Sequence, residues 1–543
     1  MQDRCGVSVS SAGDVNGDGV DDIIIGAYWA DPNGQGAAGE SYVVYGGAKV
    51  GSSGVINLST LNGENGLVLQ GISSGDYSGY SVSAAGDVNG DGIDDVIIGA
   101  MRADPRGASN AGASYVVFGG ESVATASTFE LSSLNGSNGF VLNGVSSFDL
   151  SGISVSSAGD VNGDGIDDII IGAMRGDPNG NYAAGECYVL FGNDSLGFPD
   201  TIELSSLDGA NGFVMNGIDE DDNSARSVSS AGDVNDDGVD DLIIGAYRAA
   251  PDGRFTAGES YVVFGGPTVG SSGEIELSSL NGTNGYVLNG IDTRDRSGHS
   301  VSSAGDVNGD GVDDLIIGAF YASPNGEGLA GECYVVFGGP TVGSSGEIEL
   351  SSLNGANGFV LNGVDGADRC GWAVSSAGDF NGDGFGDLII GAFRASPHGK
   401  ERAGESYIVF GSESAGSSGA LDLSSLDGTN GFVLNGLFRG DYSGFSVSTA
   451  GDVNGDGLDD VIIGAYHAWP NGINTAGESY VVFGRRVPCP ADTNDDGTLS
   501  PADFTAWISA FHAITDACDQ NGDGSCTPAD FTAWLANYKA GCP

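Results

Sequence analysis

An aspartate- and glycine-rich segment recurs seven times along this chain, at a spacing of 73 residues and without slippage. Each copy reads close to GDVNGDGVDDLIIGA. A fixed period of this length is the signature of a repeat architecture in which each copy is one structural unit. The chemistry of the chain must therefore lie in this segment, in a surface that the modules build together, or in the short C-terminal tail. The copies begin at Asp14, Asp87, Asp160, Asp233, Asp306, Asp379 and Asp452.

The second copy shows how one repeat is predicted to fold. Ser78–Asp87 alternates small and apolar residues, and the apolar run Val96–Ile98 is short enough for a strand buried on both faces. A turn leads to a third predicted strand, Ala113–Phe118, and a polar connection leads to a fourth, Gly139–Gly144. Four antiparallel strands repeated seven times predict an all-β fold, a seven-bladed β-propeller. An open β-solenoid is the alternative, although 73 residues is long for one solenoid coil.

The repeat count leaves the seventh copy one strand short. Its third predicted strand ends at Phe483-Gly484 with no GFVLNG segment after it, and the first copy begins at Met1, where a preceding GFVLNG strand would end. A propeller can close by completing its last blade with a strand from the other terminus. We therefore expect the natural chain to start upstream of Met1, with a closing strand and a signal peptide there. A propeller left open at blade seven is the alternative.

Charge and composition exclude several functions. The chain has 74 acidic and 18 basic residues and a formal net charge of −56, which would repel a phosphate backbone, so we expect no nucleic-acid partner. No run of 18 apolar residues occurs, so we expect no membrane span. No nucleophile–base pair or catalytic carboxylate set stands apart from the repeated aspartates, so the sequence predicts that the protein is not an enzyme.

The repeated loop has the oxygen spacing of a calcium site. In the first copy Asp14, Asn16, Asp18 and Asp22 supply side-chain oxygens at positions 1, 3, 5 and 9, and Val20 supplies a carbonyl at position 7. All-oxygen ligation with three carboxylates suits Ca²⁺, whereas Mg²⁺ usually keeps several waters. A metal-free turn rich in Asp, Asn and Gly is the alternative. The corresponding residues of the other copies are Asp87, Asn89, Asp91, Ile93, Asp95; Asp160, Asn162, Asp164, Ile166, Asp168; Asp233, Asn235, Asp237, Val239, Asp241; Asp306, Asn308, Asp310, Val312, Asp314; Asp379, Asn381, Asp383, Phe385, Asp387; and Asp452, Asn454, Asp456, Leu458, Asp460.

These segments resemble the FG-GAP repeat of the integrin alpha-subunit β-propeller. The likeness covers residues 1 to about 486 and rests on the loop, on the IIGA that follows it and on the closing YVVFG. The resemblance implies a propeller domain at 1–486, with the calcium loops on its lower face and ligands bound on its upper face. No inserted domain interrupts a blade, and all seven copies keep the loop residues, whereas integrins use only some.

The tail, residues 487–543, carries a second duplication with an offset of 27 residues. Each half is a 12-residue loop with oxygen side chains at positions 1, 3, 5, 9 and 12 that runs through PADFTAW into a short amphipathic helix. The pair resembles the type I dockerin, whose loops are EF-hand-like. The predicted ligands are Asp492, Asn494, Asp496, Thr498, Ser500 and Asp503 in the first half, and Asp519, Asn521, Asp523, Ser525, Thr527 and Asp530 in the second.

The dockerin resemblance implies two further Ca²⁺ ions, beyond about seven in the propeller, and a cohesin-like or cell-surface protein partner. Positions 10 and 11, where cellulosomal dockerins contact cohesin, are Pro501-Ala502 and Pro528-Ala529 here. An acidic unstructured tail and a calcium-stabilised cap on the propeller are the alternatives. If the helices form, they should pack around four aromatic side chains. These are Phe504, Trp507, Phe531 and Trp534.

The eight cysteines fall into two groups. Cys5 and Cys370 share one repeat position, and Cys187 and Cys333 share another. Equivalent positions in separated modules of a ring are too far apart to bridge, so we expect four free thiols. In the tail we expect disulfide pairing of undefined connectivity. The tail cysteines are Cys489, Cys518, Cys526 and Cys542.

Two loops vary between copies, the one after IIGA and the one before the first strand, and both open on the same face of a blade. Seven-fold geometry should place the residues that follow IIGA in a ring that is cationic and aromatic. Such a ring could hold an acidic glycan or protein carboxylates. Alternatively, each arginine pairs locally, for example with Glu259 or Glu405. The ring residues are Trp29, Arg102, Arg175, Arg248, Tyr321, Arg394 and His467.

The sequence therefore predicts a secreted, calcium-stabilised propeller with a dockerin-like tether, acting outside the cell as an adhesion or ligand-binding module. The ligand would be a glycan or a protein bound on the face opposite the calcium loops. The alternative is a catalytic or non-catalytic component of an extracellular polysaccharide-degrading system.

Overall fold

The computed structural model describes residues 2–194, 197–486, 491, 493, 499–513, 518, 520 and 525–540. They divide into two compact units. The first contains Met1–Phe380 and Phe385–Phe483, and the second contains Asn381–Gly384 and Gly484–Pro543.

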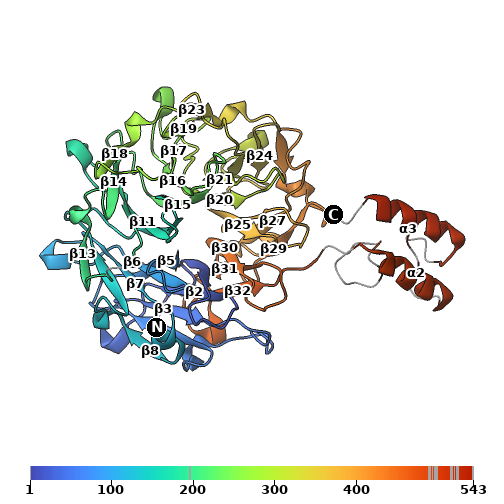
Figure 1. Ribbon diagram of the computed structural model, residues 1–543, viewed down its shortest axis with the longest axis horizontal. Helices are drawn as coiled ribbons and strands as arrows, with labels where there is room; N and C mark the ends of the chain where they lie inside the picture. Colours follow the sequence, from blue (N-terminus) through green and yellow to red (C-terminus); the bar gives the residue numbers. More distant parts are fainter. Residues whose placement is uncertain are drawn as a thin grey trace. The chain divides into compact units, whose positions relative to one another are not determined.

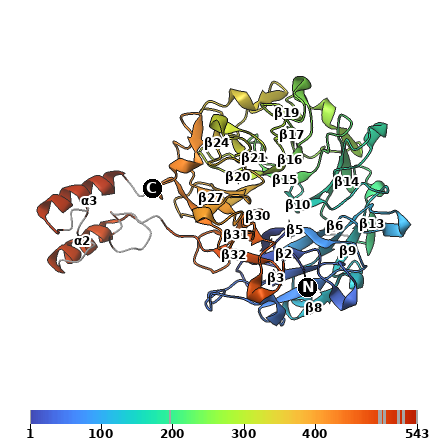
Figure 2. The same ribbon diagram turned by 180° about the vertical axis from the view of Figure 1, so that it is seen from behind.

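The first unit is a seven-bladed β-propeller, with one blade for each repeat (Figures 1 and 2). The first strand of each blade lies against the first strands of the neighbouring blades, so these strands form the inner wall of the ring. The blades follow one another in sequence order, and blade 1, in blue, lies beside blade 7, in orange. The contact between their first strands closes the ring. The prediction of a propeller is therefore confirmed, and the open solenoid is excluded.

Within each blade the first three strands run antiparallel in chain order, and blades 1 to 6 add a fourth antiparallel strand. The first strands are β1 (Val9–Gly13), β5 (Ser78–Gly86), β10 (Ser154–Gly159), β15 (Ser227–Gly232), β20 (Ser300–Gly305), β25 (Ala373–Gly378) and β30 (Ser446–Gly451). The second strands are β2 (Asp22–Ala27), β6 (Asp95–Ala100), β11 (Asp168–Ala173), β16 (Asp241–Ala246), β21 (Asp314–Ala319), β26 (Asp387–Ala392) and β31 (Asp460–Ala465). The third strands are β3 (Glu40–Val44), β7 (Ala113–Val117), β12 (Glu186–Leu190), β17 (Glu259–Val263), β22 (Glu332–Val336), β27 (Glu405–Val409) and β32 (Glu478–Val482). The fourth strands are β4 (Gly66–Gln70), β9 (Gly139–Asn143), β14 (Gly212–Asn216), β19 (Gly285–Asn289), β24 (Gly358–Asn362) and β29 (Gly431–Asn435).

Blades 1 to 5 carry a fifth, three-residue strand that the sequence did not predict. It comes from the connection before the fourth strand of the next repeat and pairs in parallel with the fourth strand of the preceding blade. The prediction of four strands per blade is thus correct for blade 6 alone, and blade 7 has three strands in the described part of the chain. The fifth strands are β8 (Thr128–Glu130), β13 (Thr201–Glu203), β18 (Glu274–Glu276), β23 (Glu347–Glu349) and β28 (Ala420–Asp422).

Short helical turns occupy the loops of the blades. Those after the second strands are η1 (Pro32–Gly34), η3 (Pro105–Gly107), η5 (Pro178–Gly180), η7 (Pro251–Gly253), η9 (Pro324–Gly326), η11 (Pro397–Gly399) and η13 (Pro470–Gly472). Those before the fourth strands are η2 (Leu58–Thr60), η4 (Leu131–Ser133), η6 (Leu204–Ser206), η8 (Leu277–Ser279), η10 (Leu350–Ser352) and η12 (Leu423–Ser425). A single α-helical turn, α1 (Glu121–Ala124), precedes β8.

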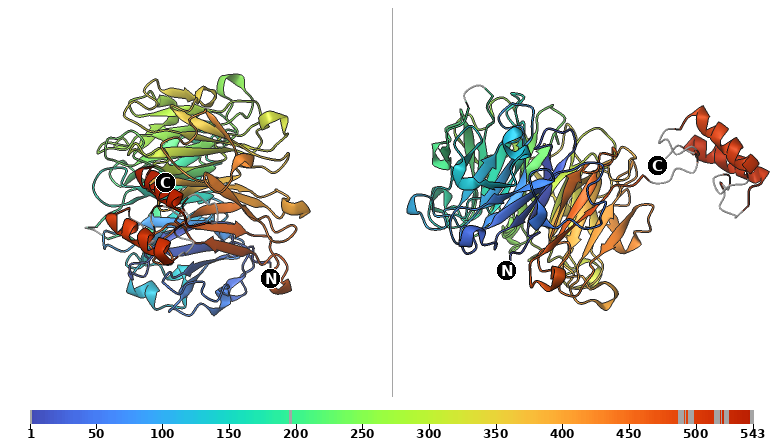
Figure 3. Two further views of the ribbon diagram at one scale, coloured as in Figure 1. Left: turned by 90° about the vertical axis from the view of Figure 1, so that its right-hand side faces the viewer. Right: turned by 90° about the horizontal axis from the view of Figure 1, so that it is seen from below.

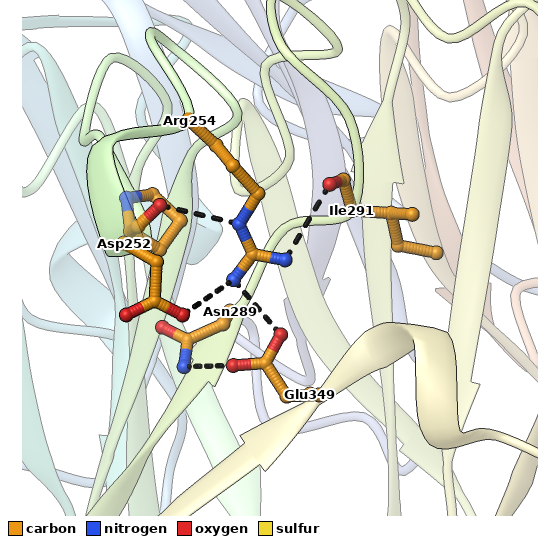
Figure 4. Close-up of polar contacts among 6 residues, drawn as sticks. Asp252, Arg254, Asn289, Ile291 and Glu349 are labelled. Carbon is orange, nitrogen blue, oxygen red and sulfur yellow. Dashed lines mark hydrogen bonds and ion pairs between the residues drawn. The ribbon is translucent and has the colours of Figure 1, made fainter.

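The acidic side chain at the end of the fifth strand ties neighbouring repeats together, as Figure 4 shows for blade 4. The Glu349 carboxylate accepts a hydrogen bond from Asn289 of β19 (2.8 Å) and pairs with Arg254 (2.8 Å). Arg254 also donates to the carbonyl of Ile291 (3.5 Å). The same arrangement joins Arg106 to the equivalent glutamate of blade 2. The fifth strand therefore links two blades through side chains as well as through its backbone.

Apolar packing between adjacent sheets provides the core of the ring. Every residue of the second strands is buried, because neighbouring blades cover both faces of each strand. The buried apolar residues form seven clusters, each shared by two adjacent blades. The cluster between blades 7 and 1 contains Ile462 and Ile23. The main-chain N–H of Cys5 also donates to the carbonyl of Ala476 (2.9 Å), so this junction closes by packing and by hydrogen bonds.

The four cysteines of the propeller are free and buried, as expected. The expectation that these cysteines lie far apart compared only equivalent repeat positions, and it is wrong for one pair at different positions. Cys333 of β22 and Cys370 of the next blade occupy different repeat positions, and their thiols lie within hydrogen-bonding reach across the junction of blades 5 and 6. Burial raises the pKa of the Cys333 thiol well above its usual value, and the contact with Cys370 raises it further.

The second unit contains the two predicted tail helices, α2 (Pro501–Ala513) and α3 (Pro528–Ala540), which lie side by side in Figure 3. The ring centroids of Phe504 and Trp534 are 5.2 Å apart, and those of Trp507 and Phe531 are 5.5 Å apart, so the four aromatic residues pack together as predicted. A disulfide joins Cys518 and Cys526, while Cys489 and Cys542 lie outside the described residues. No helix among the described residues is long and apolar enough to cross a bilayer.

Candidate functional sites

The repeated acidic loop joins the first and second strands of each blade. In the first loop, the Asp14 carboxylate accepts main-chain N–H bonds from Asp18 (2.9 Å) and Gly19 (2.7 Å). The Asp18 carboxylate accepts the N–H of Val20 (3.0 Å). The same bonds recur in the second to fifth loops, and in the seventh loop. The loop thus holds the side chains of positions 1 and 5 around its own bend.

The position 9 aspartate is the buried member of the loop. The Asp22 carboxylate has no exposed surface and accepts hydrogen bonds from the main chain of Gly46 (2.8 Å) and from the Asn16 amide (3.2 Å). Burial raises its pKa to about 8, and the negative charges of Asp18 and Asp14 act in the same direction. Four further loops show the same shift at position 9. A cation among these carboxylates would relieve both the burial cost and the mutual repulsion.

The donor chemistry of the loops fits a hard cation, since three carboxylates, an amide and a carbonyl are all oxygen ligands. In the described residues, however, no three His, Cys, Asp or Glu side chains are gathered as a metal-binding group. The carboxylates instead face the main-chain N–H groups of their own loop, and the Asn16 amide turns its nitrogen toward Asp22. The sixth loop is divided between the two units, and only Asp379, Phe385 and Asp387 belong to the propeller.

Position 8 of the loop performs a role that the sequence analysis missed. The Asp94 carboxylate accepts the main-chain N–H of Asp14 in the preceding blade (2.8 Å), and Asp21 does the same for Asp452 (2.8 Å), across the junction that closes the ring. Six of the seven junctions have an aspartate at this position. The exception is Gly386, whose own N–H donates to the carbonyl of Asp306 (2.7 Å). In these six loops the first aspartate of the pair therefore lies at a blade–blade junction, and the second is the predicted metal ligand.

The predicted tail ligands are described only in part. Asp492, Asn494, Asp496, Thr498, Asp519, Asn521 and Asp523 lie outside the described residues. Asp503 and Asp530 are fully buried. Each carboxylate accepts a hydrogen bond from the main-chain N–H of the residue three positions earlier, Ser500 (2.7 Å) and Thr527 (2.6 Å) respectively. The hydroxyls of Ser500 and Thr527 in turn accept the N–H of the residue two places on. These contacts cap the starts of α2 and α3. Ser525 precedes α3.

The two variable loops of each repeat meet in the structure. In six blades the main-chain N–H of the ring residue, the second residue after IIGA, donates to an aspartate carbonyl of the loop before the first strand. Examples are the bonds from Trp29 to Asp3 (3.3 Å) and from Arg102 to Asp76 (3.2 Å). In blade 7 the His467 ring contacts the carbonyl of Gly440 (3.0 Å). The ring residues and this preceding loop together form a surface that we term the variable face.

Two of the four ring arginines stack on aromatic rings. The Arg102 guanidinium lies 4.5 Å from the ring centroid of Tyr77, and that of Arg394 lies 5.5 Å from that of Phe393. Arg248 approaches Asp221 at 4.0 Å. No ion pair with Glu259 or Glu405 occurs among the described residues, and these carboxylates accept hydrogen bonds from tyrosine hydroxyls instead. Arg175 is exposed.

Two further sets of residues belong to the variable face and were not singled out from the sequence. One is equivalent to Tyr77 and includes Arg296 and Arg369. The other directly precedes the first strand and includes His299 and Trp372, whose rings lie 4.4 Å apart. Both sets follow the same 73-residue period in a loop already known to vary, so tabulating that loop position by position would have found them.

Aspartates of the preceding loop add a ring of partly protonated carboxyls. Burial raises the pKa of Asp295 to about 7, and the neighbouring Glu332 and Asp292 act in the same direction. Asp368 shows the same shift to about 7, through burial and then Glu405. Asp295 and Asp368 therefore lie near other carboxyls, while Arg102 and Arg394 stack on aromatic rings.

Comparison with known proteins connects the repeats to one family. The model of the FG-GAP repeat matches residues 6–44, 78–117, 151–190, 225–263, 297–335, 371–409 and 443–482. Integrin alpha-PS2 of Drosophila melanogaster is 30% identical over 43% of this chain and 15% of its own length, and integrin alpha-5 of Xenopus laevis is 28% identical over 44% of this chain and 19% of its own.

An enzyme also shares the repeats. Phosphatidylinositol-glycan-specific phospholipase D of Bos taurus is 29% identical over 36% of this chain and 22% of its own length. The chain therefore spans less than a quarter of the length of these relatives.

Proposed function

Because the chain belongs to the FG-GAP repeat family, we propose that it is an extracellular, calcium-binding adhesion or ligand-binding module whose ligand is taken by the variable face. The ligand is a glycan or a protein with acidic groups. Seven Ca²⁺ ions bound in the propeller loops and two in the tail would stabilise the folded chain, and the tail would tether it to a cohesin-like or cell-surface protein.

The observation that carries this proposal is the contrast between the two ends of each second strand. The N-terminal ends all begin with the same buried aspartate, whereas the C-terminal ends present different cationic and aromatic side chains in a protein with a net charge of −56. Stacked guanidinium groups keep their charge and their hydrogen-bond donors available for a carboxylate or sulfate. The relation to integrin alpha chains agrees with a binding module.

A binding screen with matched variants tests the proposal. The full chain in calcium buffer should bind a defined subset of an acidic and neutral glycan array or of a panel of extracellular proteins. Replacing Trp29 by Ala together with Arg102→Gln should weaken that binding. The control Lys49→Gln, which removes an exposed positive charge from the connection after β3, should not. Equal loss in both variants would refute a site on the variable face.

A role in polysaccharide or glycolipid breakdown is the second candidate, since the related phospholipase D is an enzyme by name. Turnover assays on acidic and neutral polysaccharides and on phosphatidylinositol-glycan would reveal it. Catalysis that survives substitution of the variable face would favour this candidate over a binding module.

A further inference from the structure

We propose that blades 5 and 6 carry a specific site for the carboxylate or sulfate group of an acidic polysaccharide, formed by Arg296 and Arg369 on the ring of Tyr321 and by the neighbouring Arg394. This site rests on the proposed function, because it names the ligand class for one part of the variable face.

Two guanidinium groups face one tyrosine ring at this point. Those of Arg296 and Arg369 lie 4.5 Å and 4.7 Å from the ring centroid of Tyr321. Arg369 also donates a hydrogen bond to the Tyr321 hydroxyl (3.2 Å). A third arginine lies beside this pair, because the main-chain N–H of Arg394 donates to the carbonyl of Asp368, the residue before Arg369 (3.3 Å). Burial lowers the pKa of Arg369, and the charges of Arg394 and Arg296 lower it further. Such a cluster is unfavourable by itself and becomes favourable when an anion binds it.

No carboxylate neutralises this cluster in the described residues. The arginines that form ion pairs among the described residues are Arg106, Arg248, Arg254 and Arg439, none of which belongs to the cluster. The Nε atoms of Arg369 and Arg394 are buried and have no hydrogen-bond partner. A buried donor without a partner carries a desolvation cost, which an incoming oxyanion would remove.

The nearest acidic residues in the sequence do not serve as partners. Asp295 and Asp368 directly precede two of the three arginines, yet their raised pKa values arise from burial and from other carboxyls, with no arginine lowering them. By contrast, the equivalent Asp222 of blade 4 does experience Arg248, which lowers its pKa against a larger rise from burial. The charge of the blade 5–6 cluster is thus left available to a ligand.

The surroundings favour a polysaccharide over an acidic peptide. Trp372 lies next to the cluster, with its ring centroid 4.7 Å from that of Phe393 and 5.4 Å from that of Phe445. The Phe445 ring continues to Tyr466 at 4.3 Å. Trp372, Phe445 and Tyr466 are partly exposed. A platform of aromatic rings beside a charge site offers the apolar face that a pyranose ring can stack on, with its acidic substituent on the guanidinium groups.

The site is confined to one sector of the ring. At the position of Arg296 and Arg369, blade 3 has Leu150 and blade 4 has Asn223. Blade 1 has Arg4, which stacks on Trp29 (4.4 Å) without a second arginine over that ring among the described residues. Arg102 in blade 2 is stacked on Tyr77 in the same way as Arg369 on Tyr321, but no second arginine lies over that tyrosine ring among the described residues. Arg102 therefore provides a comparison with a stacked arginine of the variable face that lies outside the cluster.

Calorimetric titration of the full chain in calcium buffer tests the proposal. The probes are oligogalacturonate, a chondroitin sulfate oligosaccharide, a neutral xylan oligosaccharide and an oligoglutamate peptide. We expect one of the acidic oligosaccharides to bind. The double variant Arg369→Gln/Arg394→Gln should bind it at least tenfold more weakly than the unmodified chain, a larger loss than for Arg102→Gln. The control Lys49→Gln, an exposed residue outside the variable face, should stay within about threefold of the unmodified chain. Removing two repelling charges should leave the thermal midpoint of the ligand-free double variant equal or higher.

Different results overturn different claims. If an acidic oligosaccharide binds and only Arg102→Gln weakens it, the cluster is not the site, while the variable face still binds. Stronger binding of oligoglutamate than of any oligosaccharide would replace the polysaccharide with an acidic protein. No binding of any probe would refute the cluster as an anion site, and the wider binding screen would still decide the proposed function. If the ligand-free double variant has a lower thermal midpoint than the unmodified chain, the binding test uses Arg394→Gln alone, because that variant keeps the Arg369–Tyr321 hydrogen bond.

Discussion

Removal of calcium should destabilise the propeller, and the loss should grow as the pH rises. In five loops the position 9 aspartate has its pKa raised from 3.8 to about 8, first by burial. A carboxyl group whose pKa is higher in the folded chain than in the unfolded chain stabilises the fold fully below the unfolded value. That contribution disappears as the pH rises through the folded value. The calcium-free propeller should therefore lose stability between about pH 4 and pH 8.

Calcium should reverse this trend, because the ionised carboxylate is the form that binds metal. Extracellular calcium modules have dissociation constants of about 0.1–1 mM. At about 2 mM free Ca²⁺, each site would then add about 0.6–1.8 kcal/mol to the free energy of unfolding. Seven independent loops would add about 5–13 kcal/mol, which is comparable to the whole stability of many domains.

Differential scanning calorimetry on protein stripped by a chelating resin measures this effect. The stripped chain should unfold at a lower temperature near pH 8 than near pH 5.5, and added Ca²⁺ should raise the midpoint more at the higher pH. Mg²⁺ at equal ionic strength should have a smaller effect. Asp95→Asn, which removes one titrating carboxyl, should reduce the calcium increment. Identical midpoints with and without calcium at both pH values would refute the calcium reading of the loops.

Three more predictions concern the contacts between repeats. Asp94→Ala should lower the free energy of unfolding by about 1–3 kcal/mol, because it leaves the N–H of Asp14 without its charged acceptor. Asp94→Asn should lower it by less, and equal denaturant midpoints for both variants and the unmodified chain would contradict this. Arg254→Ala should cost about 1 kcal/mol in the same assay, because the contact that it loses with Glu349 is partly exposed, and a loss above about 3 kcal/mol would show that another contact is involved. The four propeller thiols should resist a thiol reagent in the native protein and react after denaturation. Burial raises the pKa of Cys5 to about 12 and keeps the other three thiols away from the reagent. Labelling of the native chain would contradict their placement.

The period and the alternation of apolar residues were sufficient to predict most of the blade. The strands predicted in copy two agree with β5, β6, β7 and β9 to within a residue or two at each end. β8 could not be predicted in this way, because it is three residues long and pairs with a strand of the preceding repeat. A strand of this length has too few residues for a recognisable period, and only the neighbouring blade fixes its register.

The candidate sites also depend on contacts between blades that the sequence alone does not reveal. The spacing of the loop assigns Asp22 to the predicted ligands and gives Asp21 no role. The role of Asp21 emerges only when the preceding blade is in position, because Asp21 reaches across the junction while Asp22 turns inward. Similarly, the period predicts where Tyr321 and Arg394 lie, but the gathering of Arg296 and Arg369 on one tyrosine depends on how two adjacent blades meet.

The second strand links the two functional ends of each blade. In blade 1, β2 begins at Asp22, the buried predicted ligand, and ends at Ala27, two residues before Trp29 of the variable face. Six residues in extended conformation span about 17 Å, so a cation in the loop cannot contact a ligand on the variable face. Every residue of this strand is buried between neighbouring blades, which makes it a stiff connection. A dependence of ligand binding on calcium would therefore report the stability and alignment of the blades, and not a bond between the metal and the ligand.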